Sequence, residues 1–168
     1  MAKKGGCCTG RALHIDLSRG SWTVNDIDDE TRHRFLGGAG LNAPLALKMI
    51  PPGIDPLSPE NVILIGAGAL TGTEAFGTPK TEIVSKSPLT GTIGTALTGH
   101  FGAPLKWAGY DQLIITGRSP QPCYLRIFND EIEICDASEL WERDIYATTE
   151  TLWERYAPLE TTVAAIGQ

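Results

Sequence analysis

The first regular pattern in the chain is an alternation of apolar and polar side chains from residue 11 to residue 17. Leu13, Ile15 and Leu17 fall on one face of this segment, which is the period of a half-buried strand. After a turn at residues 18–20 the alternation resumes. The segment therefore predicts a β-hairpin.

A second hairpin is predicted near the end of the chain, where the alternating segments 123–128 and 131–135 flank Asn129-Asp130. Uninterrupted apolar runs are typical of strands that are covered on both faces. Such runs, together with the short segment TEIVS, predict further strands at residues 62–65, 81–85, 113–115 and 163–166.

Helices are indicated where polar residues precede an apolar period and glycine or proline follows it. The first helix follows the acidic residues 26–29 and ends at Gly37-Gly38. A second helix has its apolar positions between Leu41 and Ile50, with Pro44 tolerated in its first turn. Further helices are predicted at residues 101–108, from Ser138 onward, and at residues 144–156.

These elements predict an α+β fold with mixed or antiparallel sheets and short covering helices. The order hairpin, acidic linker, short helix occurs at both ends of the chain, which favours two related halves. We expect a flexible tail at residues 1–9 and one domain at residues 10–168. Because only two residues follow the strand predicted at residues 163–166, we expect this domain to lack its C-terminal part.

Composition excludes several classes of protein. The net charge is −6, and the 14 basic residues are scattered rather than clustered as a nucleic-acid site requires. The chain has no run of about eighteen apolar residues and no apolar segment after its first lysines, so we expect no membrane span, no secretory signal and a cytoplasmic location. Its four cysteines show no CxxC spacing, so neither a zinc site nor a redox dithiol is indicated.

Glycine and threonine are concentrated between residues 62 and 110. The segment GAGALTG, residues 66–72, has the outline of a dinucleotide fingerprint, which requires a helix that begins at its glycines. Gly77 and Pro79 interrupt any such helix, and the acidic residue expected about twenty positions later is absent. We therefore reject a dinucleotide site.

Two other glycine segments leave a choice open. Thr98-Gly99-His100 precedes the helix predicted at residues 101–108, so Thr98 is interpreted either as a plain N-cap or as part of an anion site. Lys80 and Lys86 flank TEIVS and would add positive charge to the same pocket. The GGAG segment at residues 37–40 is either a tight joint between helices or a place where backbone approaches a ligand.

Several ordered motifs are similar to one known family. They are FLGGAGL at 35–41, DPLSPEN at 55–61, GALTGT at 68–73, SKSPLTG at 85–91, FGAPLKWAGYD at 101–111 and DASELW at 136–141. Together with the first hairpin they resemble the N-terminal domain of the aldehyde ferredoxin oxidoreductase family. The resemblance extends from about residue 10 to residue 168.

The resemblance implies a fold of two sheets in pseudo-twofold related halves, and a cofactor of tungsten or molybdenum bound by two pterins. It implies oxidation of aldehydes to carboxylic acids with water as the oxygen source, with electrons passed through a [4Fe-4S] cluster to ferredoxin or another electron-transfer subunit. The cluster ligands of the family lie outside this chain. The 168-residue chain alone is therefore predicted to be inactive, and a homodimer is left open.

The resemblance also implies cofactor contacts at Lys80, Thr98, Gly99 and His100. Lys80 stands where the family usually has a phosphate-binding arginine, and it keeps the charge without the bidentate fork. Leu97 replaces an asparagine of the family's pterin loop, and Ala39 replaces an arginine. These departures keep two alternatives open: a divergent member such as a benzoyl-CoA-reductase-type tungsten subunit, and a non-catalytic domain that binds pterin or a partner.

Overall fold

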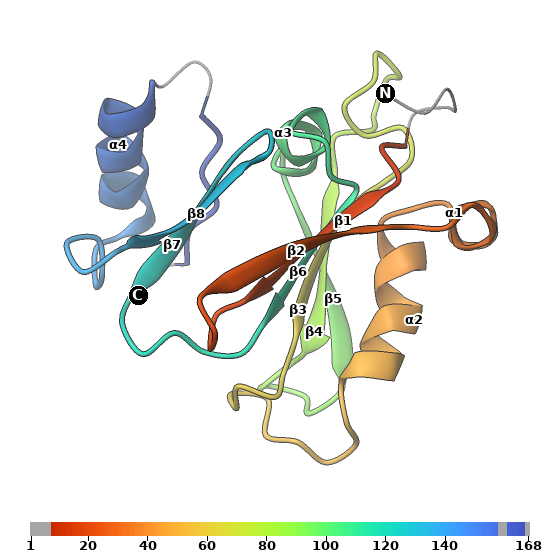
Figure 1. Ribbon diagram of the computed structural model, residues 1–168, viewed down its shortest axis with the longest axis horizontal. Coiled ribbons are helices and arrows are strands. Elements are labelled where there is room, and N and C mark those ends of the chain that lie inside the picture. The colour runs from red at the N-terminus through yellow and green to blue at the C-terminus, as the bar shows by residue number, and fades with distance from the viewer. Residues whose placement is uncertain (1–7, 158–160, 167–168) are drawn as a thin grey trace.

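Six strands form one mixed sheet in the order β2-β1-β6-β3-β4-β5 (Figure 1). The computed structural model describes residues 8–157 and 161–166. The strands of this sheet are β1 (Arg11–Asp16), β2 (Ser21–Asp26), β3 (Ile63–Ala67), β4 (Thr81–Lys86), β5 (Ile93–Thr98) and β6 (Gln112–Thr116). Only β1 and β6 are parallel neighbours within it. The predicted α+β class with a mixed sheet is confirmed.

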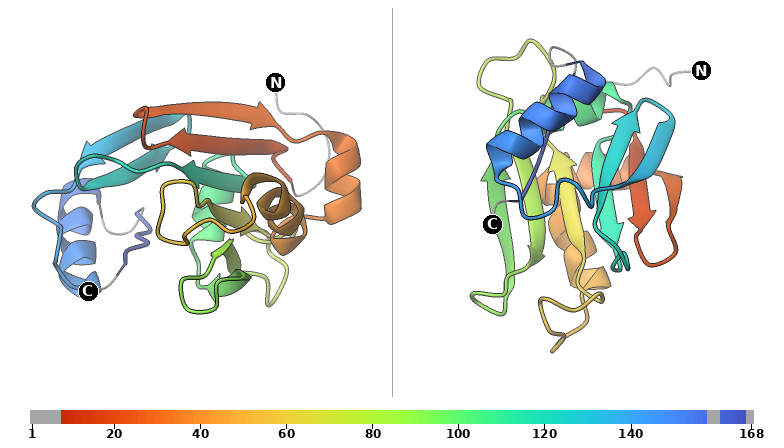
Figure 2. Two further views of the ribbon diagram at one scale, coloured as in Figure 1. Left: turned by 90° about the horizontal axis from the view of Figure 1, so that it is seen from below. Right: turned by 90° about the vertical axis from the view of Figure 1, so that its left-hand side faces the viewer.

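The second hairpin forms a sheet of its own from β7 (Cys123–Phe128) and β8 (Glu131–Asp136). Helix α4 (Ile145–Tyr156) follows it, and Asp144 caps this helix by accepting a hydrogen bond from the Ala147 amide at 2.8 Å. Figure 2 shows α4 at one end of the molecule and α1 (Asp29–Phe35) at the other. The predicted order of hairpin and helix at both ends of the chain is therefore present.

Helices α1 and α2 (Ala39–Met49) are joined by a very short turn. Asp28 caps α1 by accepting a hydrogen bond from the Thr31 amide at 2.8 Å, as its acidic start predicts. Leu36 then takes the left-handed conformation with φ 55°, and two glycines with positive φ lead directly into α2. Only residues 36–38 therefore separate the two helices.

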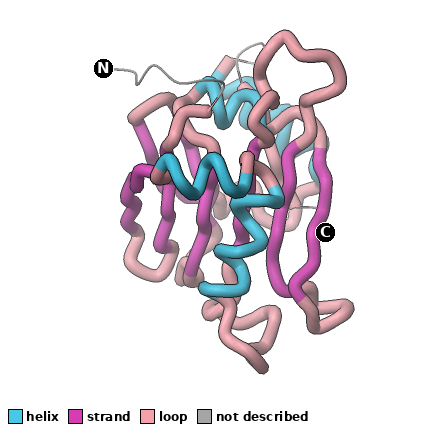
Figure 3. The backbone as a smooth tube through the Cα atoms, turned by 90° about the vertical axis from the view of Figure 1, so that its right-hand side faces the viewer, coloured by secondary structure: helices cyan, strands magenta, loops and turns pink. Residues whose placement is uncertain are grey.

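The core lies on both faces of the large sheet. Ala12 and Leu13 are consecutive residues of β1 that are both buried, which requires cover on each side because neighbouring side chains point to opposite faces. On one face Ala46 and Ile50 of the α2 region pack on the strands, as Figure 3 shows for the helix itself. The opposite face is covered by helix α3 (Gly102–Trp107) and by the β7–β8 hairpin.

Three predicted elements differ in the structure. Residues 138–140 form a turn rather than a helix, because Asp136 accepts a hydrogen bond from the Ser138 amide at 2.9 Å and competes with helical pairing. Residues 163–166 pair with no strand among the described residues, although Val163 packs against the buried cluster of Ala137, Leu140 and Leu152. The strand predicted at residues 62–65 begins at Ile63, whose side chain is 44% exposed.

Strand β5 was not predicted, because it lies at the edge of the sheet and buries no residue. The flexible tail was predicted at residues 1–9. Residues 1–7 lie outside the described residues, whereas the Thr9 amide donates a hydrogen bond to the Asp111 carboxylate at 3.0 Å. No helix in the described part of the chain is long and apolar enough to cross a membrane.

A tyrosine pair joins α4 to the second hairpin and makes stability depend on pH. The hydroxyl groups of Tyr124 and Tyr156 lie 2.6 Å apart, and Arg155 donates to the Tyr124 oxygen at 3.0 Å. Burial, followed by the hydrogen bond to Tyr156, raises the pKa of Tyr124 to about 12. The unfolded chain loses this proton near pH ~10, so the contribution of Tyr124 is fully present below that pH and is lost as the pH rises towards 12.

We expect Tyr124→Phe to flatten the fall in the free energy of unfolding between about pH 10 and pH 12, because the titrating group is gone. Urea denaturation at several pH values measures this slope. Tyr146→Phe is the matched control, since the Tyr146 side chain is 82% exposed, and it should keep the slope of the parent chain. Equal slopes for all three proteins would contradict the prediction.

Candidate cofactor site

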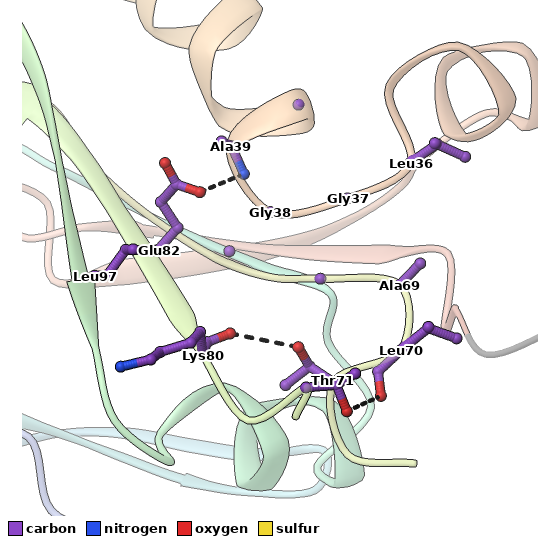
Figure 4. Close-up of a pocket in the computed structure, with 14 residues that line it drawn as sticks. Leu36, Gly37, Gly38, Ala39, Ala69, Leu70, Thr71, Lys80, Glu82 and Leu97 are labelled. Carbon is purple, nitrogen blue, oxygen red and sulfur yellow. Dashed lines mark hydrogen bonds between the residues drawn. The ribbon is translucent and has the colours of Figure 1, made fainter. Parts of the chain in front are cut away.

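A hollow of about 500 Å³ opens where the α1–α2 joint, the end of β3, the start of β4 and strand β5 come together (Figure 4). Most of its wall is backbone or small side chains. The lining residues are Leu36, Gly37, Gly38, Ala39, Gly40, Gly66, Gly68, Ala69, Leu70, Thr71, Thr78, Lys80, Glu82 and Leu97.

The GGAG segment at residues 37–40 packs against the end of β3 and also lines the hollow. The Gly38 amide donates to the Ala67 carbonyl at 2.9 Å, so the joint between the helices lies directly on the end of β3. A Cβ on Gly37 would lie 3.0 Å from the Ala67 oxygen, and a Cβ on Gly40 would lie 2.0 Å from the Phe35 oxygen. Close packing therefore requires glycine here, which also leaves the wall of the hollow without side chains.

The alternation of β4 places two charged side chains at the hollow. Lys80 and Glu82 both line it, whereas Thr81 between them is fully buried on the other side. Glu82 accepts a hydrogen bond from the Ala39 amide at 3.0 Å, so the carboxylate lies at the N-terminus of α2, where the helix dipole stabilises it. The protein's own side chain thus occupies the anion position of this helix.

Lys80 is exposed, and its ammonium forms no ion pair with any residue in ranges 8–157 and 161–166. Figure 4 shows the Lys80 side chain directed away from the Glu82 carboxylate. Lys80 is therefore a cation of the hollow that a ligand can use. Lys86, predicted to share the pocket, instead donates to the Ile54 carbonyl at 2.6 Å and does not line the hollow.

Of the two interpretations of Thr98, the one that makes it the N-cap of the following helix is wrong. Thr98 is the last residue of β5 and pairs with Thr81, while α3 begins only at Gly102, after a start without a side-chain cap of its own. The Thr81 hydroxyl accepts a hydrogen bond from the Gly102 amide and donates to the Gly99 carbonyl at 2.9 Å. Thr81, which lies 21 positions before Gly102, thus caps this helix. The Gly102 amide is therefore no longer available to an anion.

The structure brings only part of the predicted site together. Leu97 lines the hollow opposite Glu82 in the strand register, and its side chain is 66% exposed. Thr98, Gly99 and His100 are exposed at the end of β5 and do not line the hollow. Because paired residues of antiparallel strands share a face, Thr98 lies on the side of Thr81 and α3.

Sequence reasoning missed Lys106, which lies behind the wall of the hollow. Its ammonium donates to the Gly68 carbonyl at 2.7 Å and to the Ala69 carbonyl at 2.6 Å. The ammonium is 4.0 Å from the Asp111 carboxylate, and both side chains are almost fully buried. A lysine among the apolar residues of FGAPLKWAG was the available signal, because a buried lysine requires partners.

These residues fit a planar cofactor with an anionic end. The hollow combines the charge of Lys80 with a glycine backbone wall, and the exposed side chains of Leu36, Leu70 and Leu97 offer apolar surface at its edge. Among the described residues no cluster of three His, Cys, Asp or Glu side chains is placed to hold a metal ion.

The chain shares its fold with part of a solved enzyme complex. It superposes with a TM-score of 0.87 on the active site complex of benzoyl coenzyme A reductase in complex with 1,5-dienoyl-CoA, with 36% sequence identity. The match covers 91% of this chain and 24% of that one. The chain belongs to the aldehyde ferredoxin oxidoreductase family, because the model of the family's N-terminal domain matches residues 12–168.

Curated relatives agree with this assignment. The chain is 42% identical over 159 residues to a tungsten-containing aldehyde ferredoxin oxidoreductase of Pyrococcus furiosus, covering 94% of this chain and 26% of the relative. It is 40% identical over 136 residues to the WOR-like subunit of an aliphatic sulfonate oxidoreductase of the same organism, covering 79% of this chain and 22% of that subunit. The chain thus spans about a quarter of the length of these relatives. The resemblance read from the sequence motifs is confirmed.

The two threonines paired at the end of β4 and β5 provide a matched test of the cap. We expect Thr81→Val to lower the free energy of unfolding by about 1–3 kcal/mol, because the Gly102 amide and the Gly99 carbonyl lose their buried partner. Thr98→Val, at an exposed position, should change it by less than about 0.5 kcal/mol. Urea denaturation of both variants measures the difference, and equal losses would disprove the assignment of the cap to Thr81.

Proposed function

We propose that this chain is the part of a pterin-dependent tungsten or molybdenum oxidoreductase that receives the cofactor. The observation that carries the proposal is the position of Lys80: in a domain of this family, it is a cation at a glycine-lined hollow, with no ion pair to the residues that the structure describes. A phosphate on a pterin needs such a cation, and the flat ring system needs a wall without side chains.

The residues of this chain bind and orient the cofactor in this proposal. Lys80 neutralises a phosphate, and the backbone at residues 37–38 lets the ring system approach. Thr98, Gly99 and His100, which do not line the hollow, contact a part of the cofactor that extends past it to the end of β5. The bound metal-pterin group supplies the oxidation–reduction chemistry. Ala39 and Leu97, which replace polar residues of the family pattern, leave this site with fewer hydrogen bonds than the pattern predicts.

For the whole protein we propose that an aldehyde and water are converted to a carboxylic acid, with two electrons and two protons released. The electrons pass through a [4Fe-4S] cluster held outside this chain to ferredoxin, a partner that the names of the relatives support. A cytoplasmic location and a homodimer belong to the same proposal. A benzoyl-CoA-reductase-type subunit is the second candidate, favoured by the TM-score of 0.87 to that complex.

The test is the cofactor content of the full-length protein that contains this chain. We expect tungsten or molybdenum by mass spectrometry, together with a fluorescent pterin after oxidation, and reduction of a viologen dye with an aldehyde. Activity with an aromatic acyl-CoA and none with aldehydes would favour the second candidate. A protein without pterin, purified after growth with tungstate and molybdate, would refute both.

Lys80→Ala in the same protein should lower pterin occupancy at least about tenfold, because the phosphate loses a charge-assisted hydrogen bond. Lys80→Arg should retain occupancy, since arginine keeps the charge. Lys48→Ala is the matched control: Lys48 is also exposed, but it lies in the last turn of α2 and does not line the hollow. Unchanged pterin and metal content in Lys80→Ala would remove Lys80 from the site.

A further inference from the structure

Among the described residues that line the hollow, two carry a charged side chain: Lys80 and Glu82. Lys80 is the proposed phosphate contact, which leaves Glu82 as the second charged group of the same hollow. Figure 4 shows the Lys80 side chain directed away from the Glu82 carboxylate, which lies beside Ala39. The two charges are therefore separate, and a ligand meets them at different places.

The protein uses only part of the hydrogen-bonding capacity of the Glu82 carboxylate. One oxygen, Oε2, accepts the hydrogen bond from the Ala39 amide at 3.0 Å. The other, Oε1, has no hydrogen bond or ion pair within ranges 8–157 and 161–166, and it is not one of the buried polar atoms that lack a partner there. Oε1 is therefore accessible to a ligand. An ionised carboxylate accepts about four hydrogen bonds, so about three positions remain on Glu82.

The backbone around Glu82 holds its carboxylate in place. Glu82 lies in the middle of the sheet, where it pairs with Gly66 of β3 on one side and with Leu97 of β5 on the other. The side-chain amide of Asn42, which is fully buried, donates to the Glu82 carbonyl at 3.4 Å. Because the carboxylate is also held by the Ala39 amide, a ligand that binds it has little side-chain freedom to remove.

Apolar side chains flank the carboxylate. Leu97 is directly opposite Glu82 in the strand register, so the two Cβ atoms are about 4.5–5.5 Å apart on the same face of the sheet. The Leu97 side chain is 66% exposed, and the exposed side chains of Leu36 and Leu70 line the same hollow. An accessible carboxylate beside apolar surface suits a flat ring that carries N–H donors along one edge.

We propose that Glu82 recognises the ring of the ligand by accepting hydrogen bonds from two adjacent N–H donors on one edge. An aminopyrimidinone ring, as in a pterin, has such an edge in its amino group and the neighbouring ring N–H. The inference rests on the proposed function, because it adds recognition of the ring to the hollow in which Lys80 contacts the phosphate. Hydrogen bonds to an ionised acceptor are about twice as strong as neutral ones, so this edge selects the ligand.

The variant Glu82→Gln separates this role from that of a helix cap alone. The glutamine oxygen still accepts from the Ala39 amide, while its NH₂ group replaces Oε1 and presents donors to the ligand. The cap is therefore kept and the recognition of N–H donors is lost. We expect the midpoint of urea unfolding and the NMR shifts of the Leu113 and Ile114 amides in β6 to stay as in the parent chain.

Pterin and lumazine are the probes, because lumazine has a carbonyl oxygen where pterin has its amino group. Each is titrated into the isotope-labelled chain at a pH at which both rings are neutral, and the NMR shifts of the Ala39 and Leu97 amides give the affinity. We expect the parent chain to bind pterin at least about tenfold more tightly than lumazine, since a carboxylate attracts the amino group and repels the carbonyl.

In Glu82→Gln the preference for pterin should fall below about twofold, because the side chain no longer offers two acceptors to the ring. Glu60→Gln is the matched control: Glu60 is also exposed to solvent, but it does not line the hollow, and this variant should keep the preference of the parent chain.

Equal affinity for the two rings in the parent chain, or the same preference in Glu82→Gln as in the parent, would overturn the inference. Absence of binding of either ring would overturn it as well, even if the full-length protein contains pterin. Conversely, a Glu82-dependent preference in a protein that purifies without pterin would refute the proposed function and leave Glu82 as the recognition residue for an aminopyrimidinone ring.

Discussion

The buried pair of Lys106 and Asp111 is the interaction on which the arrangement of the molecule depends. Asp111 holds the backbone before β1, pairs through its main chain with β1 and β3, and lies 4.0 Å from the ammonium of Lys106. Lys106 in turn holds the turn after β3. A charge that is taken out of water needs a full set of partners, so these segments have little freedom to move independently. Gly68 and Ala69, which Lys106 holds, form part of the wall of the hollow.

A second constraint is the close approach of backbone to backbone at the α1–α2 joint. Gly37 and Gly38 adopt positive φ and lie against the end of β3, where a side chain would meet main-chain atoms. The same absence of side chains that permits this packing leaves an open surface for a flat ligand. Structure and proposed function therefore place the same demand on these positions, and the presence of glycine alone does not separate the two.

Family membership extends over nearly the whole chain, whereas the hollow departs from the family pattern in some of its residues. The family is shown by a match over residues 12–168 and by relatives near 40% identity, whereas the chain covers about a quarter of those relatives. Lys80 is the residue of the family pattern that the structure places in the hollow, and Leu97 beside it offers no hydrogen bond. The cofactor contacts that we propose for this chain therefore rely on charge and backbone more than on polar side chains.

The sequence by itself determined the elements whose signal is local. The alternation in β1, β7 and β8 and the caps at Asp28 and Asp144 depend on neighbours a few positions away, so they could be read directly. Motifs in a fixed order also predicted the family, which the match over residues 12–168 confirms. The false helix at Ser138 arose because a side-chain hydrogen bond from Asp136 competes locally with the helical pattern.

Only the tertiary structure decided which polar groups meet across the sheet. Thr81, rather than Thr98, caps α3 from 21 positions away, and Lys106 binds carbonyls 37 and 38 positions before it. Strand β5 exists because β4 offers it an edge, not because its own residues bury a face. Such contacts leave no period in the chain, since their geometry is set by the register of strands that are distant in sequence. For that reason the sequence predicted the family and most of the strands, while the composition of the hollow emerged only from the fold.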